Sequence, residues 1–98
     1  GKSAKIKIYS GQNGVIQIDG YLPGILFKEN TIKVYGNGGL LYDGGINSDG
    51  IFSIVFNAPK DSIVDLVIRP GKTIIPSKEG INDDNRELGF LIKNISVY

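Results

Sequence analysis

The residues best suited to chemistry gather in a polar stretch near the end of the chain, where Asp83, Asp84 and Arg86 lie close together. Two neighbouring carboxylates could share a proton or act on one bond of a substrate. Adjacent residues of an extended chain point to opposite sides, however, so Asp83 and Asp84 are poorly placed to work as a pair. Asp side chains also bond to nearby backbone amides in turns. We therefore expect the two aspartates to form a turn and not a catalytic pair.

Asp84 and Arg86 are two residues apart, which puts them on the same side of an extended segment. Arg is scarce in this chain, and its planar guanidinium can hold a carboxylate or a phosphate through two hydrogen bonds. It could clamp Asp84 and the loop carbonyls, or bind an anionic or sugar ligand. We favour the clamp, and we expect Arg86→Ala to destabilise the fold by about 2–4 kcal/mol if the pair is buried.

A calcium site is a weaker possibility, carried by Asp43, Asn47 and Asp49 among several glycines. Ca²⁺ takes six or more oxygen ligands, and such side chains could supply some of them. The spacing differs from the twelve-residue calcium loop and lacks its closing Glu, and the same residues are common in plain turns. We therefore expect a turn here and no bound metal.

Aromatic residues suggest a different kind of site, because sugar rings have apolar faces that stack on aromatic side chains. Tyr9, Tyr35 and Tyr42 lie opposite or outside the apolar sets of their segments, so we expect them to be exposed on a sheet. The chain has no Trp, and Tyr is frequent in strands through β propensity alone. The three tyrosines are candidate glycan-binding residues, with ordinary strand packing as the alternative.

The composition excludes several classes of function. The chain contains no Cys and no His, and so it lacks a thiol nucleophile, a thiolate metal site and the usual general base. The net charge is +1, with both signs scattered, whereas nucleic-acid binding normally leaves a clustered basic face. No apolar run is long enough to cross a bilayer. We expect no cofactor, no nucleic-acid partner and no direct membrane insertion.

Short segments of alternating polarity, separated by Gly and Pro, predict an all-β fold. Inward-facing sets are expected in the segments 4–9, 15–19, 31–35, 51–56, 63–69 and 88–98, with shorter strands at 40–43 and 72–75. These segments predict about eight strands in a two-sheet antiparallel sandwich of jelly-roll type. The segments 4–9 and 15–19 should pair as a hairpin. The apolar positions of the last strand change phase near Lys93 and Asn94, which predicts a β-bulge there.

Residues 1–98 are enough for one small domain. The chain starts without Met, which favours a module cut from a longer protein. Its late segment reads Pro76-x-x-x-Gly80-x-x-x-Asp84-x-Arg86-x-Leu88-Gly89-Phe90 and then Ile95-x-Val97. Earlier come Gly20-Tyr21-Leu22-Pro23, Ile32-x-Val34-Tyr35-Gly36-Asn37-Gly38, Asp49-Gly50-x-Phe52 and Phe56-x-x-Pro59.

Taken together, these motifs resemble a family of accessory β-sandwich domains in bacterial cell-surface polysaccharide enzymes, chiefly glycosyltransferases and related phosphoglycerol transferases. The resemblance implies a non-catalytic module, with the catalytic domain of the parent chain as its partner and Asp84 and Arg86 as signature positions. It also implies a cytoplasmic location. Fold likeness alone does not establish function, so two alternatives stay open: a dedicated carbohydrate-binding module, and a structural domain that pairs with a protein through a sheet edge.

Overall fold

The computed structural model describes residues 3–22, 29–46, 50–73, 75, 77–80 and 89–98. The described residues form seven strands: β1 (Ala4–Tyr9), β2 (Val15–Leu22), β3 (Asn30–Gly36), β4 (Gly39–Ile46), β5 (Gly50–Asn57), β6 (Ile63–Pro70) and β7 (Leu91–Val97). Within these residues we find no helix that could cross a membrane.

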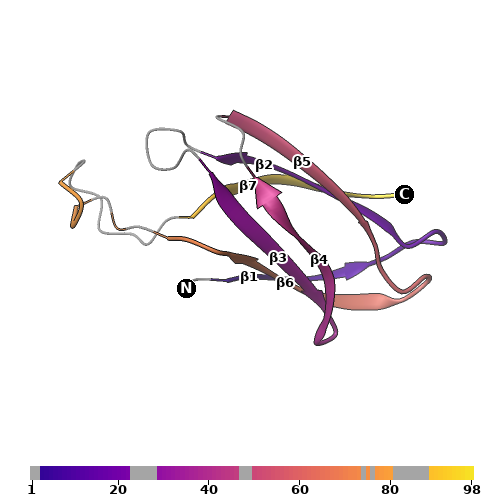
Figure 1. Cartoon of the computed structure of the whole chain (residues 1–98). Helices are drawn as coiled ribbons and strands as arrows, with labels where there is room; N and C mark the ends of the chain where they lie inside the picture. Colours follow the sequence, from indigo (N-terminus) through magenta and orange to yellow (C-terminus); the bar gives the residue numbers. More distant parts are fainter. Residues whose placement is uncertain (1–2, 23–28, 47–49, 74, 76, 81–88) are drawn as a thin grey trace.

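The strands pack as two antiparallel sheets (Figure 1). Sheet A has the strand order β1-β6-β3-β4, and sheet B has the order β5-β2-β7. Consecutive strands lie in different sheets except for the hairpin β3–β4. The pairs β2–β5 and β1–β6 are nested around this hairpin, and β7 returns to pair with β2. This winding is that of a jelly roll, so the predicted antiparallel sandwich is confirmed.

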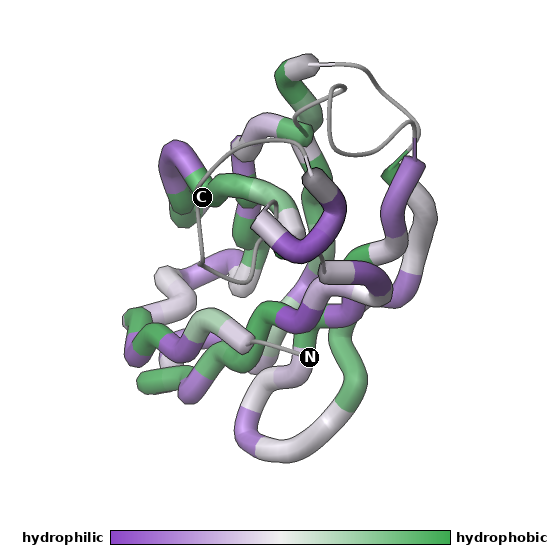
Figure 2. The backbone as a smooth tube through the Cα atoms, turned by 90° about the vertical axis from the view of Figure 1, so that its left-hand side faces the viewer, coloured by the Kyte–Doolittle hydropathy of each residue, from purple (hydrophilic) through white to green (hydrophobic). Residues whose placement is uncertain are grey.

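The core lies between the two sheets and is built from alternate residues of the strands. Figure 2 shows how hydrophobic and hydrophilic residues alternate along the backbone. The buried apolar side chains are Ile16, Ile18, Leu22, Ile32, Val34, Ile46, Phe52, Ile54, Phe56, Val64, Leu66 and Ile68. The inward-facing sets predicted in the segments 15–19, 51–56 and 63–69 are therefore confirmed as alternate residues of β2, β5 and β6.

The predicted hairpin between the first two strands is wrong. β1 pairs with β6 in sheet A, whereas β2 pairs with β5 and β7 in sheet B. The connection from β1 to β2 therefore crosses between the sheets, and it lies beside the β5–β6 connection, which crosses in the other direction. The two connections share the backbone hydrogen bonds Ala58 N to Gly14 O and Asp61 N to Gly11 O, each 2.7 Å.

Ser10 ties these two crossing connections together. Its side chain is fully buried, and its hydroxyl donates to the carbonyl of Pro59 at 2.5 Å while accepting the N–H of Ser62 at 3.1 Å. Its own N–H donates to the carbonyl of Ser62 at 2.9 Å. These bonds satisfy the carbonyl of Pro59 and the N–H and carbonyl of Ser62. Because such buried backbone groups need partners, the bonds stabilise the crossing connections in the absence of a β1–β2 hairpin.

The predicted bulge in the last strand is confirmed. Asp19 pairs with Asn94 and the next residue, Gly20, pairs with Ile92, so Lys93 is the extra residue. The bulge brings Ile92 and Ile95 onto the inner face although they are three positions apart.

A two-residue turn joins β3 to β4. Asn37 and Gly38 both have positive φ, 50° and 86°, as a type I′ hairpin turn requires. Asn followed by Gly is the residue pair that this turn type favours.

Two strands run well past their predicted ends, and one predicted strand is absent from the residues that the structure describes. β2 continues through Gly20 to Leu22, and β4 continues through Gly44 and Gly45 to Ile46, because cross-strand pairing carries both strands past their glycines. The expected strand at 72–75 is not present in the described residues of that segment. The described count is therefore seven strands and not eight.

Candidate functional site

Several predicted site residues fall outside the part of the chain that the structure describes. Asp84 and Arg86 do so, and the expected clamp stays a prediction. Asn47 and Asp49 also lie outside it, while Asp43 is exposed on β4 and is in register with Lys33. Among the described residues, no three acidic side chains come together in a way that could hold a metal ion.

The three candidate tyrosines do not form one platform. Tyr42 differs from the expectation: it pairs with the inward-facing Val34 and packs against Phe56, with 6.2 Å between the ring centroids. The bulge where β4 passes β3 puts Tyr42 on the core side. Tyr9 and Tyr35 lie on the outer face of sheet A, where register pairs them with Ile63 and Val67 of β6.

Both outer tyrosines have partners within the fold. The hydroxyl of Tyr9 donates a hydrogen bond to the carboxylate of Asp61, and this bond raises the pKa of Tyr9 above its usual value. The guanidinium of Arg69 lies 5.3 Å from the centroid of the Tyr35 ring, which is a cation–π contact. The two tyrosines on the outer face of sheet A therefore make contacts within the fold, Tyr9 with Asp61 and Tyr35 with Arg69.

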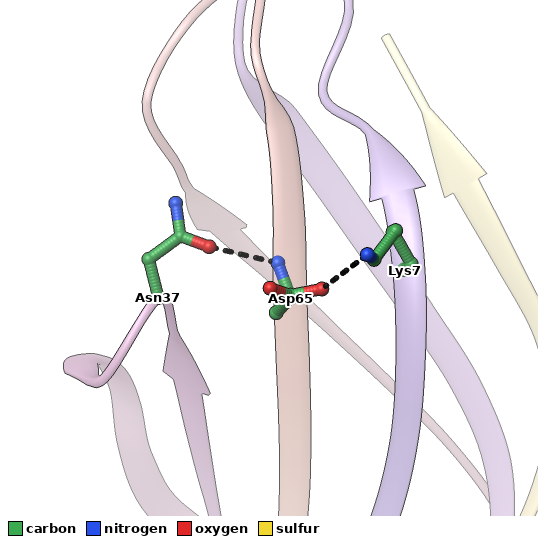
Figure 3. Close-up of polar contacts among 3 residues, drawn as sticks. All are labelled: Lys7, Asn37 and Asp65. Carbon is green, nitrogen blue, oxygen red and sulfur yellow. Dashed lines mark hydrogen bonds and ion pairs between the residues drawn. The ribbon is translucent and has the colours of Figure 1, made fainter.

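The same face carries charged and polar side chains around Asp65 (Figure 3). Its carboxylate lies 3.7 Å from Nζ of Lys7 on β1, and its N–H donates to Oδ1 of Asn37 at 2.9 Å. The N–H of Asn37 donates in return to the carbonyl of Asp65 at 3.1 Å. The exposed ion pair is worth about 0–1 kcal/mol. The two hydrogen bonds between Asn37 and Asp65 hold the tip of the β3–β4 hairpin against β6.

The outer face of sheet B has a different composition. We call it the β5–β2–β7 face, and it consists of Ile51, Ser53, Val55 and Asn57 of β5, Val15, Gln17, Asp19 and Tyr21 of β2, and Leu91, Asn94, Ser96 and Tyr98 at β7. Asp19 carries the one formal charge among these residues, and the exposed bulge residue Lys93 of β7 is next to Asn94 in the chain. The other polar groups are amides and hydroxyls, which both donate and accept hydrogen bonds.

Asp19 is the centre of this face. Its Oδ1 accepts hydrogen bonds from Nε2 of Gln17 at 2.9 Å and from Oγ of Ser53 at 2.7 Å. The bond from Gln17, then that from Ser53, and also Asn94, lower the pKa of Asp19 below its usual value. A carboxylate has about four lone-pair sites, so Asp19 keeps acceptor capacity for a ligand hydroxyl.

Exposed apolar side chains lie at one end of the face and a tyrosine at the other. Tyr21 is in register with Ile51 on one side and Leu91 on the other, and all three side chains are exposed. At the opposite end the hydroxyl of Tyr98 donates to Oε1 of Gln17 at 3.2 Å. Tyr21 and Gln17 are four residues apart on one strand, which corresponds to roughly 13 Å.

Sequence reasoning missed this face, although part of the signal was visible. Gln17, Asp19 and Tyr21 alternate with Ile16, Ile18 and Gly20, so they had to share the solvent side of one strand. The other residues come from strands far away in sequence, and nothing in the alternation indicates which strands pair.

Comparison with known proteins adds no further constraint: no protein-family model, curated protein or solved structure matches the chain.

Proposed function

We propose that this chain is a non-catalytic module that binds a neutral glycan across the β5–β2–β7 face. One observation carries the proposal: a hydrogen-bonded centre of Asp19, Gln17 and Ser53 lies between the exposed rings of Tyr21 and Tyr98. Sugars combine hydroxyls, which need planar polar partners, with apolar C–H faces, which need aromatic ones. The face supplies both along a length of roughly 13 Å.

The hydrogen bonds within the face favour binding because they fix the polar groups before a ligand arrives. Gln17 and Asp19 hold each other, so little side-chain entropy is lost when a sugar hydroxyl bonds to either of them. The carboxylate of Asp19 at the centre of the face favours a neutral polysaccharide over an anionic one, since an anion would meet a like charge there.

The proposal assigns binding and no reaction to this chain, which has neither His nor Cys. Together with the resemblance of the segment from Pro76 to Val97, it describes an accessory module that holds a polysaccharide close to a sugar-transferring catalytic domain. Fold-level resemblance supports this context only by analogy.

The proposal is tested by titrating the protein with neutral oligosaccharides and monitoring the NMR chemical shifts of its backbone amides. We expect shifts to concentrate on β2, β5 and β7. Tyr21→Ala should weaken binding about 2–13-fold, the range given by an aromatic contact of about 0.5–1.5 kcal/mol. Asp19→Asn should weaken it about fivefold, because a charge-assisted hydrogen bond becomes a neutral one.

Tyr9→Ala is the matched control, since Tyr9 is also an exposed tyrosine but lies on the outer face of sheet A. It should leave glycan affinity unchanged. The proposal is refuted if no neutral glycan in a broad array shifts the β5–β2–β7 face, or if Tyr9→Ala weakens binding as much as Tyr21→Ala does.

A further inference from the structure

The two long sides of the sandwich are closed to different degrees. On one side β4 and β5 contact each other, and Ile46 of β4 and Phe52 of β5 are buried there. On the other side β1 and β7 are the outermost described strands of their sheets, and they share no contact of that extent. Ile6, which shares the inner face with Leu66, is 43% exposed there. Among the described residues, the core is therefore open along this side.

β1 is the most exposed strand at the open side. Five of its six residues are exposed and the sixth, Ile8, is half-buried. A pocket of about 310 Å³ lies beside it, and its lining residues are Lys5, Ile6, Lys7, Asp65, Leu66 and Val67. Lysines alternate with isoleucines along the strand, so its outer face is basic and its inner face apolar.

The backbone of β1 offers hydrogen bonds at its outer edge. The N–H of Ser10 donates to the carbonyl of Ser62, which identifies this pair as hydrogen-bonded across β1 and β6. In an antiparallel ladder the bonded pairs alternate, so the N–H and C=O of Lys5, Lys7 and Tyr9 point away from β6. No described strand lies on that side. The β1 edge can therefore accept one more strand.

We propose that the β1 edge binds an extended peptide segment of a protein partner in which acidic and apolar residues alternate. Its backbone adds a fifth strand to sheet A, a mode of recognition in which main-chain bonds give affinity and alternate side chains give specificity. Its apolar side chains cover Ile6 and Ile8. Its acidic side chains lie beside Lys5 and Lys7.

Charge is what selects an acidic partner over a second copy of this chain. An antiparallel pair of two β1 strands centred on Ile6 would put Lys5 of one copy opposite Lys7 of the other. Like charges directly opposite each other in a sheet are destabilising, and edge lysines commonly prevent self-pairing. An acidic partner residue opposite Lys5 or Lys7 instead makes a favourable pair. At Lys7 it replaces the present contact with Asp65, which is 3.7 Å away.

A synthetic eight-residue peptide of alternating valine and glutamate is a direct probe, with alternating valine and lysine as its control. We expect the glutamate peptide to shift the amide signals of β1 and to bind more weakly as salt is added. The double variant Lys5→Glu/Lys7→Glu should lose about tenfold in affinity for it and gain affinity for the lysine peptide, since each cross-strand charge pair contributes about 0.2–1 kcal/mol.

Lys7→Pro is a second test, because the N–H of Lys7 points to the free edge and its loss breaks no backbone bond to β6. Only the exposed ion pair with Asp65, worth little to stability, is lost on that side. This variant should fold and fail to bind. Three results would each overturn the proposal: no binding of the glutamate peptide at millimolar concentration, equal binding by the charge-reversed variant, or dimers formed through β1. Glycan affinity should be unchanged in these variants, so the outcome is separable from that of the proposed glycan site.

Discussion

Gly20 offers the sharpest test of the packing beneath the β5–β2–β7 face. It lies in the middle of β2, the central strand of sheet B, and pairs with Phe52 on one side and Ile92 on the other. A Cβ at this position would lie 2.5 Å from the carbonyl oxygen of Leu91 and 2.6 Å from Cε2 of Phe52. Real Cβ atoms do not approach other atoms so closely, so Gly20→Ala must displace both neighbours.

Neither neighbour can move freely. The ring of Phe52 packs edge-on against Phe90, with 5.6 Å between the centroids, and the Leu91 carbonyl belongs to the strand that pairs with β2 next to the bulge. Overpacking of a core costs about 1–3 kcal/mol, against a gain of about 0.4–1 kcal/mol from the lower entropy of the unfolded alanine chain. Because two fixed neighbours must both move, the overpacking cost lies at the upper end of its range, and we expect a net destabilisation of about 2 kcal/mol.

Thermal unfolding measures this effect, since about 1 kcal/mol shifts Tm by about 4–8 °C in a domain of this size. Gly20→Ala should therefore lower Tm by about 8–16 °C. Gly45→Ala is the matched control: Gly45 is an exposed glycine of β4, and an added Cβ would meet no atom within 4 Å. It should leave Tm unchanged or raise it slightly. Equal melting temperatures for the two variants would refute the packing argument.

Three further predictions concern polar groups. Ser10→Ala should destabilise the fold by about 1–3 kcal/mol in urea unfolding, because Pro59 and Ser62 each lose a buried partner, and an unchanged midpoint would contradict this. Asn30→Ala should cost about 2–4 kcal/mol in the same assay, since the buried amide makes three hydrogen bonds; a smaller loss than for Ser10→Ala would argue against their importance. The pKa of Asp19 is lower in the folded chain, so its contribution to stability is present above about pH 4 and is lost as the pH falls through the folded pKa. Asp19→Asn should therefore flatten the acid side of the stability profile, and a profile identical to that of the parent chain would contradict the assignment.

The sequence alone determined which residues of β2, β5 and β6 face inward. Period-two alternation is a local property, so Phe52, Ile54 and Phe56 could be placed on one face without knowledge of any neighbour. The phase change around Lys93 was likewise visible as a bulge. Asn37 and Gly38 are typical of a turn, because few other residues accept positive φ.

The tertiary structure decided which strands meet. Alternation along a strand does not indicate which strand it pairs with. Proximity in sequence wrongly favoured a hairpin between β1 and β2. The two strands instead pair in different sheets, because that arrangement buries the inner faces of both sheets against each other. For the same reason the β5–β2–β7 face could not be read from the chain: Asp19, Ser53 and Asn94 come from separate strands that only the sheet pairing brings into one row. Tyr42 shows the same limit, because a bulge opposite β3 turned a residue expected on the surface towards Phe56.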